Sequence, residues 1–167
     1  MRINVSGLLK SSFGTSREYR IDDNIKIGDS DCRVQGEVNL TRTNRGILTR
    51  ARLHTEVEVT CCRCLKRFAS PLEIDFEEEY FPVIDVNSGV ALSLPEEPGC
   101  FTIDTRHILD LSEAVRQYVL LVIPMKPLCR EDCAGICSVC GRNLNDGKCG
   151  CKVTEIDPRW SKLSKLL

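Results

Sequence analysis

The residues best suited to chemistry in this sequence are its cysteines, eleven in all, of which six fall between residues 129 and 151. Their spacing in this stretch is C-x3-C-x3-C-x2-C-x8-C-x-C. Thiolates are soft, compact ligands, and four of them around one ion form a common structural zinc site. A run this dense therefore indicates metal binding. Further upstream, Cys61 and Cys64 have the same C-x2-C spacing as Cys137 and Cys140.

Eight of the cysteines form four close pairs, enough for two four-cysteine zinc sites. These pairs are Cys61/Cys64, Cys129/Cys133, Cys137/Cys140 and Cys149/Cys151. We predict that the last two pairs share a ribbon-like site, because they are neighbours in sequence. The first two pairs would share the other site and close a long loop of chain. Other pairings among the last six cysteines, and a single zinc site, stay open.

The ligand types favour structural sites over catalytic ones. A catalytic zinc keeps an open position and usually has histidine or carboxylate ligands, whereas His54 and His107 lie away from the cysteine pairs. The sequence has no glycine-rich phosphate loop and no G-x-S-x-G motif. We therefore predict a protein that is not an enzyme and binds no nucleotide cofactor. A thiol redox switch and iron held by four cysteines stay open as alternatives.

We expect the cysteines to be reduced. An odd number of cysteines fits a closed disulfide set poorly, and residues 1–10 lack an apolar run followed by a cleavage site of small residues. No stretch of about 18 consecutive apolar residues occurs, so no membrane span is expected. The sequence thus favours a cytoplasmic location and zinc over disulfides. We assign no role to Cys32, Cys62 and Cys100.

The elements that must position the cysteines are mostly strands. Residues 33–59 alternate apolar and polar side chains on both sides of the turn Thr43–Gly46, where Gly46 would adopt a positive φ; this pattern predicts a hairpin. The alternation resumes between residues 68 and 81. Shorter strands are expected over residues 3–9 and 17–21. We predict an α+β fold whose antiparallel, strand-rich sheet, or partial barrel, packs on one buried helix.

That helix is expected over about residues 110–123. Asp110 as N-cap and Glu113 three residues later match a capping box, and Pro124 would end the helix. Apolar residues recur at helical spacing, and together they cover more of the helix surface than a single stripe. We therefore expect most of the helix to be buried.

The cysteine pattern also suggests a domain division. We expect residues 1–128 to form the strand-rich α+β domain. Residues 129–167 would form a cysteine-rich, zinc-ribbon-like module, in which Asn145–Gly147 makes a turn. This module would end in a short helix that begins near Asp157.

Charge is unevenly distributed, although the formal net charge is only −1. Residues 33–67 hold eight basic and three acidic side chains, whereas residues 68–113 hold one basic and eleven acidic side chains. Such blocks can mark a nucleic-acid-binding face, because guanidinium groups suit phosphate oxygens. They also occur on ordinary solvated surfaces. We predict RNA contact at seven basic residues: Arg42, Arg45, Arg50, Arg52, Arg63, Lys66 and Arg67.

Several motifs together resemble the YceD family, which is named for large ribosomal RNA subunit accumulation. The resemblance runs from about Val57 to the end of the chain, and the N-terminal third shares only a strand-rich character. The motifs are Cys61-Cys-Arg-Cys-Leu65, Asp110-Leu-Ser-Glu113, Pro124-Met-Lys-Pro-Leu-Cys129, Cys133-Ala-Gly-Ile-Cys-Ser-Val-Cys-Gly141 and Asp157-Pro-Arg159. The resemblance implies a bacterial-type cytosolic protein that supports accumulation of the large-subunit (23S) ribosomal RNA.

The leading hypothesis is a non-enzymatic, zinc-binding ribosome-assembly factor. It would contact large-subunit ribosomal RNA or an early ribosomal protein. One rival is a thiol redox switch at Cys61 and Cys64 or at the C-terminal cysteines. The other is a protein adaptor whose acidic stretch, Glu77–Asp85, docks a basic ribosomal protein without touching RNA.

Overall fold

The computed structural model describes residues 1–28, 30–95 and 99–151. The helix expected near Asp157 lies outside these residues. The chain forms two compact units, one of Met1–Val59 with Ala69–Met125 and one of Thr60–Phe68 with Lys126–Leu167. The division into domains at residue 128 stays a prediction. Among the described residues, none of the helices has the length and apolar character needed to cross a membrane.

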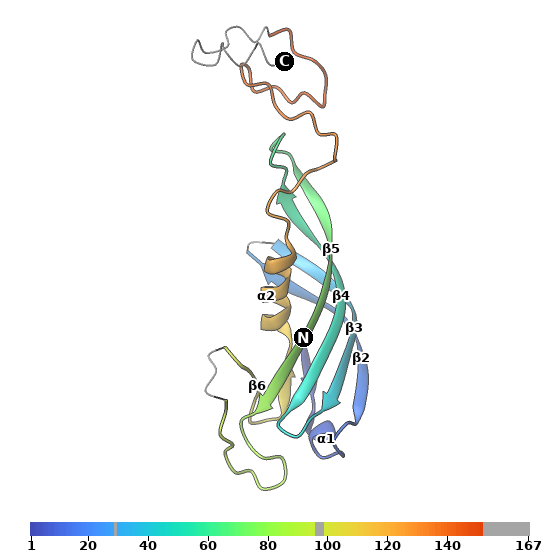
Figure 1. Ribbon diagram of the computed structural model, residues 1–167, viewed down its shortest axis with the longest axis vertical. Helices are drawn as coiled ribbons and strands as arrows, with labels where there is room; N and C mark the ends of the chain where they lie inside the picture. Colours follow the sequence, from blue (N-terminus) through green and yellow to red (C-terminus); the bar gives the residue numbers. More distant parts are fainter. Residues whose placement is uncertain (29, 96–98, 152–167) are drawn as a thin grey trace, which may run out of the picture. The chain divides into compact units, whose positions relative to one another are not determined.

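A curved, half-barrel sheet forms the framework of the first unit (Figure 1). The sheet order is β1-β7-β6-β5-β4-β3-β2. The pairs β1–β7, β2–β3, β3–β4 and β6–β7 are antiparallel, whereas β5–β6 is parallel. The predicted strand-rich partial barrel is therefore confirmed. The strands are β1 (Arg2–Asn4), β2 (Ser16–Ile27), β3 (Ser30–Arg42), β4 (Ile47–Thr60), β5 (Arg67–Pro82), β6 (Phe101–Ile103) and β7 (Ile108–Asp110).

The β3–β4 hairpin shows how alternation along the sequence sets the core face. Val38 pairs with Ala51, and both side chains are buried. The next pair, Asn39 and Arg50, is exposed, because successive side chains on a strand point to opposite faces. The buried face of the sheet thus collects the aliphatic residues of β3, β4 and β5 into one core.

Gly46 closes the turn between β3 and β4 as expected, but for a different reason. Its backbone N–H donates to Thr43 Oγ1 at 2.8 Å, and its φ is not positive. A Cβ at this position would collide with the carbonyl oxygen of Tyr80 on β5. Glycine is therefore required here by the close approach of a neighbouring strand.

Two early elements differ from the predictions. Residues 6–9 form a short helix, α1 (Ser6–Leu9), which buries Leu8 and Leu9, in place of the end of a strand. β2 runs on past residue 21, where the predicted strand ended, and every residue from Ser16 to Ile27 pairs with β3. Pairing with the long neighbouring strand outweighs the weak strand propensity of Asp and Asn.

The second helix, α2 (Ser112–Val122), covers one face of the sheet (Figure 1). It begins two residues later than predicted, because Asp110 is the last residue of β7. Asp110 Oδ1 accepts the backbone N–H of Ser112 at 2.9 Å. Glu113 forms an ion pair with Arg116, and Leu111 occupies the N-cap position without a side-chain cap. The predicted capping box is therefore wrong.

Only one side of α2 is buried, so the prediction of a mostly buried helix is also wrong. Ala114, Val115 and Val119 lie in the core of the sheet. In contrast, Leu120 and Leu121 are 51% and 76% exposed. A single helix on one face of a sheet can bury only the stripe that faces the strands, whatever the apolar content of its other side.

Candidate metal centres

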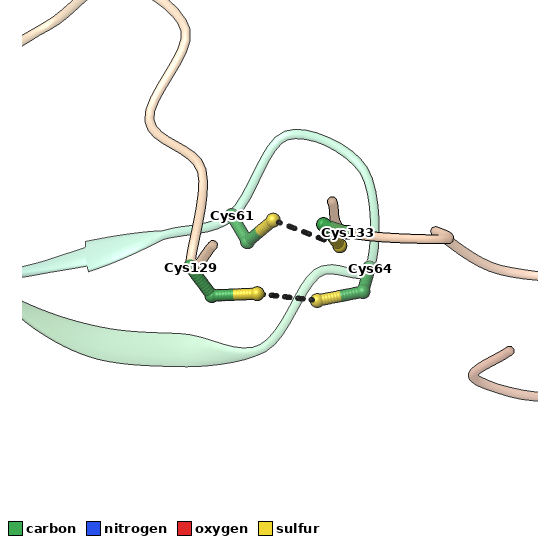
Figure 2. Close-up of side chains that lie close together, drawn as sticks. All are labelled: Cys61, Cys64, Cys129 and Cys133. Atoms are coloured by element: carbon green, nitrogen blue, oxygen red, sulfur yellow. Dashed lines mark hydrogen bonds between the residues drawn. The ribbon is translucent and has the colours of Figure 1, made fainter. Parts of the chain in front are cut away.

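Four cysteines from two distant parts of the chain meet in the second unit. Cys61 and Cys64 lie in the turn between β4 and β5, and Cys129 and Cys133 follow α2 (Figure 2). The four sulfur atoms all lie within 4.8 Å of one another. The Cys61–Cys133 and Cys64–Cys129 sulfur distances are 3.8 and 3.6 Å. Four sulfurs about 2.3 Å from a zinc ion form a tetrahedron with edges of about 3.8 Å, so this first cluster has suitable dimensions.

The turn that carries Cys61 and Cys64 is held by its own backbone. The N–H of Cys61 donates to the carbonyl oxygen of Lys66 at 2.9 Å, and the N–H of Leu65 donates to that of Cys61 at 3.0 Å. Leu65 adopts the left-handed conformation, with a φ of 60°. Backbone N–H groups, that of Cys64 above all and also that of Cys129, lower the pKa of the Cys61 thiol to about 6.

Two other thiols of the first cluster have pKa values that are shifted in opposite directions. Burial raises the pKa of Cys129 to about 12, whereas an amide hydrogen bond from Asn145 lowers the pKa of Cys133. Thiols this close compete for negative charge, and a cation among them would favour the thiolate form of all four. The cluster therefore has the electrostatic character expected of a cation site.

The second cluster is local in sequence and more open. It consists of Cys137, Cys140, Cys149 and Cys151, whose sulfur atoms also lie within 4.8 Å of one another. Cys137 is buried and Cys140 is exposed, and the other two are half-buried.

The turn of the second cluster repeats the backbone pattern of the first. The N–H of Cys137 donates to the carbonyl oxygen of Arg142 at 2.8 Å, and the N–H of Gly141 donates to that of Cys137 at 2.9 Å. The backbone N–H groups of Cys140 and Val139 lower the pKa of Cys137 to about 6. The position taken by Leu65 in the first turn is taken here by Gly141, with a φ of 70°.

The eight paired cysteines thus come together in the two groups of four that their spacing suggested. Their role as metal ligands, the zinc-ribbon character of the module and zinc itself stay predictions. The three cysteines without an assigned role lie outside both groups. Cys32 is buried in the core of the sheet, Cys62 is exposed and Cys100 is half-buried.

Asn145 is a site residue that reasoning from the sequence missed. Its Nδ2 donates to Cys133 Sγ at 3.3 Å. Its Oδ1 accepts the backbone N–H of Ala134 at 2.9 Å and a guanidinium N–H of Arg130 at 2.7 Å. The sequence gives no direct signal for this contact, because Asn145 lies in the loop of the second cluster and its partner belongs to the first.

The arginines of the β3–β4 hairpin do not form an uninterrupted positive patch. Arg45 pairs with Glu79 at 3.1 Å, and Arg50 pairs with Glu77 at 2.5 Å. The basic and acidic blocks are separate in sequence, but β4 and β5 are neighbours in the sheet. Acidic side chains therefore alternate with the basic ones on this face.

Of the other predicted RNA contacts, Arg42 is the last residue of β3, and the remaining four fall into two places. Arg52 is exposed on β4, opposite Glu37 of β3. Arg63, Lys66 and Arg67 belong to the turn of the first cluster or to the start of β5, in the second unit. There Arg63 Nη1 donates to the carbonyl oxygen of Cys133 at 3.1 Å, which ties a basic side chain to the cluster.

Fold and clusters together define a strand-rich protein with two four-cysteine groups that could bind metal. The family described as large ribosomal RNA subunit accumulation protein YceD matches residues 49–167 of this chain. The chain belongs to the YceD family.

The curated relatives of this chain are distant. The chain is 28% identical over 140 residues to uncharacterized proteins of Mycobacterium bovis and Mycobacterium tuberculosis, which covers 83% of this chain and 61% of theirs. The chain thus spans about three fifths of the length of these relatives. It is 38% identical over 58 residues to the chloroplastic large ribosomal RNA subunit accumulation protein YCED homolog 1 of Arabidopsis thaliana, covering 35% of this chain and 18% of that protein. No solved structure matches it.

Proposed function

We propose that this chain is a non-enzymatic, zinc-binding factor that supports accumulation of the large-subunit (23S) ribosomal RNA and thereby ribosome assembly in the cytoplasm. The observation that carries the proposal is the family match over residues 49–167, since the family is described by this role. The plant relative, with 38% identity over 58 residues, carries the same description.

The two clusters support a structural use of zinc. Each group consists of four cysteine sulfurs with no histidine or carboxylate among the described residues. Four thiolates complete the tetrahedral shell of zinc and leave no position for a reacting water. Zinc bound in this way contributes folding free energy, because the site does not exist in the unfolded chain. This arrangement supports an assembly factor over an enzyme.

The contacts of the acidic stretch count against the protein-adaptor hypothesis. Glu77 and Glu79 pair with arginines of the same sheet, and Glu78 accepts the hydroxyl of Tyr118 at 2.6 Å. Asp85 accepts backbone N–H groups of the loop that it begins. Carboxylates that are already engaged inside the chain are poor anchors for a basic ribosomal protein, because docking would first have to break these contacts.

The test is depletion of the protein in its own host, followed by measurement of the ratio of large- to small-subunit ribosomal RNA. We expect the ratio to fall and to recover when the wild-type chain is supplied. Cys62→Ser should restore the ratio as well as the wild type does, whereas Cys61→Ser, which removes a first-cluster sulfur, should not. An unchanged ratio after depletion would show that the proposed function is wrong.

Direct contact is tested by ultraviolet crosslinking in the same cells, followed by sequencing of the attached RNA. Crosslinks concentrated in the large-subunit RNA would support RNA contact. An RNA yield no higher than that of an untagged control would favour the protein-adaptor hypothesis instead.

A further inference from the structure

A hollow of about 440 Å³ lies on the first unit, between the β3–β4 turn and the chain that follows β5. This volume is within the range of small-molecule sites. Its polar lining comes mainly from the turn, with Arg42, Asn44 and Arg45. Its apolar lining includes Phe81 at the end of β5. Asp85 also lines the hollow, but its Oδ1 accepts backbone N–H groups of its own loop. The hollow therefore has a side with two guanidinium groups and an apolar side, which is the character of a site for an amphipathic anion.

The apolar side has a defined backbone. After β5, the N–H of Asp85 donates to the carbonyl oxygen of Val90 at 2.8 Å, and that of Leu92 donates to Val83 at 3.0 Å. These bonds fold residues 83–92 into a small hairpin, and Leu92 then lines the hollow. Leu92 and Leu94 are 41% and 40% exposed, so apolar surface at this site is open to a ligand.

Arg42 provides a cation that forms no close ion pair, although Asp85, which also lines the hollow, attracts it electrostatically. Its Nη1 donates to the carbonyl oxygen of Gly46 at 2.8 Å, and its guanidinium lies over the ring of Phe13, 5.5 Å from the centroid. Among the described residues Arg42 forms no ion pair, and its buried Nε has no hydrogen-bond partner. A buried guanidinium donor without a partner favours an anion within hydrogen-bond distance, because that anion would accept from it.

Arg45, whose charge is neutralised by Glu79, provides a flat guanidinium surface beside Arg42. It lies over the ring of Phe81, 5.3 Å from the centroid, while one nitrogen pairs with Glu79. A guanidinium held in this way offers its other face to a planar ring, and nucleic-acid bases stack on guanidinium planes as they do on aromatic rings.

We propose that this hollow receives one unpaired nucleotide of ribosomal RNA. The phosphate would lie toward Arg42, and the base would pack between Arg45 and the apolar wall that includes Leu92. The nucleotide has to be unpaired, because a base inside a duplex is stacked on its neighbours and cannot enter a pocket. This inference rests on the RNA contact in the proposed function and names where one nucleotide binds.

The test uses the full chain and compares two substitutions that add the same charge. Leu92→Arg blocks the hollow, and Leu121→Arg places an arginine on the exposed side of α2. We expect Leu92→Arg to weaken binding of a labelled single-stranded RNA about tenfold, the size expected for loss of one stacked base. Leu121→Arg should bind as tightly as the wild type or more tightly, since an added cation attracts phosphate. Fluorescence anisotropy at physiological salt measures both.

Leu94→Arg is a second blocking variant and should behave like Leu92→Arg; melting curves would identify a variant that fails to fold. Equal binding by the blocked variants and Leu121→Arg would overturn the pocket but leave RNA contact intact. Wild-type binding to duplex as tight as to single-stranded RNA would also overturn it. If the wild type bound no RNA, the RNA contact itself would be wrong, and the pocket with it.

Discussion

The two cysteine clusters use the same ligands for different structural purposes. In the first, Cys61 and Cys133 are 72 positions apart in sequence, and three of the four cysteines are buried. The second lies entirely within residues 137–151, and only Cys137 is buried. Closing a longer loop removes more chain entropy from the unfolded state. A metal in the first cluster therefore contributes to the tertiary fold, whereas one in the second orders a short segment.

The two cysteine turns also differ at one equivalent position. Both place the fifth residue in the left-handed region, but the first has Leu65 there and the second has Gly141. This conformation is sterically unfavourable for leucine, because of its Cβ, but not for glycine. The first turn thus carries strain in its backbone, and the second does not.

The largest expected difference between the clusters is in stability. Cys61→Ser should lower the free energy of unfolding of the zinc-loaded protein by about 1.5 kcal/mol more than Cys140→Ser, because the loop it releases is several times longer. Denaturant unfolding with zinc present measures both, with Cys62→Ser as the matched control that should leave stability unchanged. Equal losses would show that the first cluster does not anchor the fold.

The clusters should also lose metal in a fixed order. Exposed thiolates react first with peroxide, and Cys140 is exposed whereas Cys61 is fully buried. We expect dilute peroxide or a chelator to empty the second cluster well before the first. Zinc release and mass spectrometry of alkylated cysteines would identify the order. Simultaneous release would contradict it, and full recovery with a thiol reductant would support the redox hypothesis for the second cluster alone.

Asn145 offers a way to weaken the first cluster without removing a ligand. We expect Asn145→Ala to lower the zinc affinity of the first cluster about tenfold, because groups that hydrogen-bond to a metal ligand commonly have effects of this size. Asn145→Asp should lower it further, since a carboxylate repels the Cys133 thiolate. Competition with a zinc indicator measures the affinity, and Asn39→Ala on β3 is the control. An unchanged affinity would mean that the 3.3 Å contact has no role in metal binding.

The smallest expected effect concerns the two turns. Leu65→Gly should raise the free energy of unfolding, and Gly141→Leu should lower it, each by up to about 1 kcal/mol. Thermal unfolding of the zinc-loaded protein would measure both changes. Destabilisation by Leu65→Gly would instead show that the exposed leucine side chain makes a contact that outweighs the strain.

The features that could be predicted from the sequence depend on short-range patterns. The alternation of apolar and polar residues over residues 33–59 correctly predicted which side chains of each strand are buried, because the side-chain period of a strand is fixed by its geometry. The grouping of cysteines followed from their spacing, since pairs two or three residues apart reach one point. Neither prediction depended on which strands are neighbours in the sheet.

The features that were missed depend on neighbours in space. Arg45 and Arg50 are neutralised because β5, which carries their acidic partners, lies beside β4. Residue 46 must be glycine because the same strand, β5, passes close to it. The length of β2 was set by β3. The exposed side of α2 was set by the single sheet on which it packs, although its apolar sequence suggested burial on all sides.

Asn145 also has a consequence for how metal is taken up. It lies in the loop between Cys140 and Cys149, yet its amide nitrogen donates to a cysteine sulfur of the first cluster. An ion that orders this loop would place the amide before a second ion arrives, and by thermodynamic reciprocity each ion would then raise the affinity for the other. Loss of the ion in the second cluster would therefore lower the affinity of the first cluster, although the ion of the first cluster would still leave last because most of its thiols are buried. The hold on the buried ion would thus weaken as the supply of zinc falls.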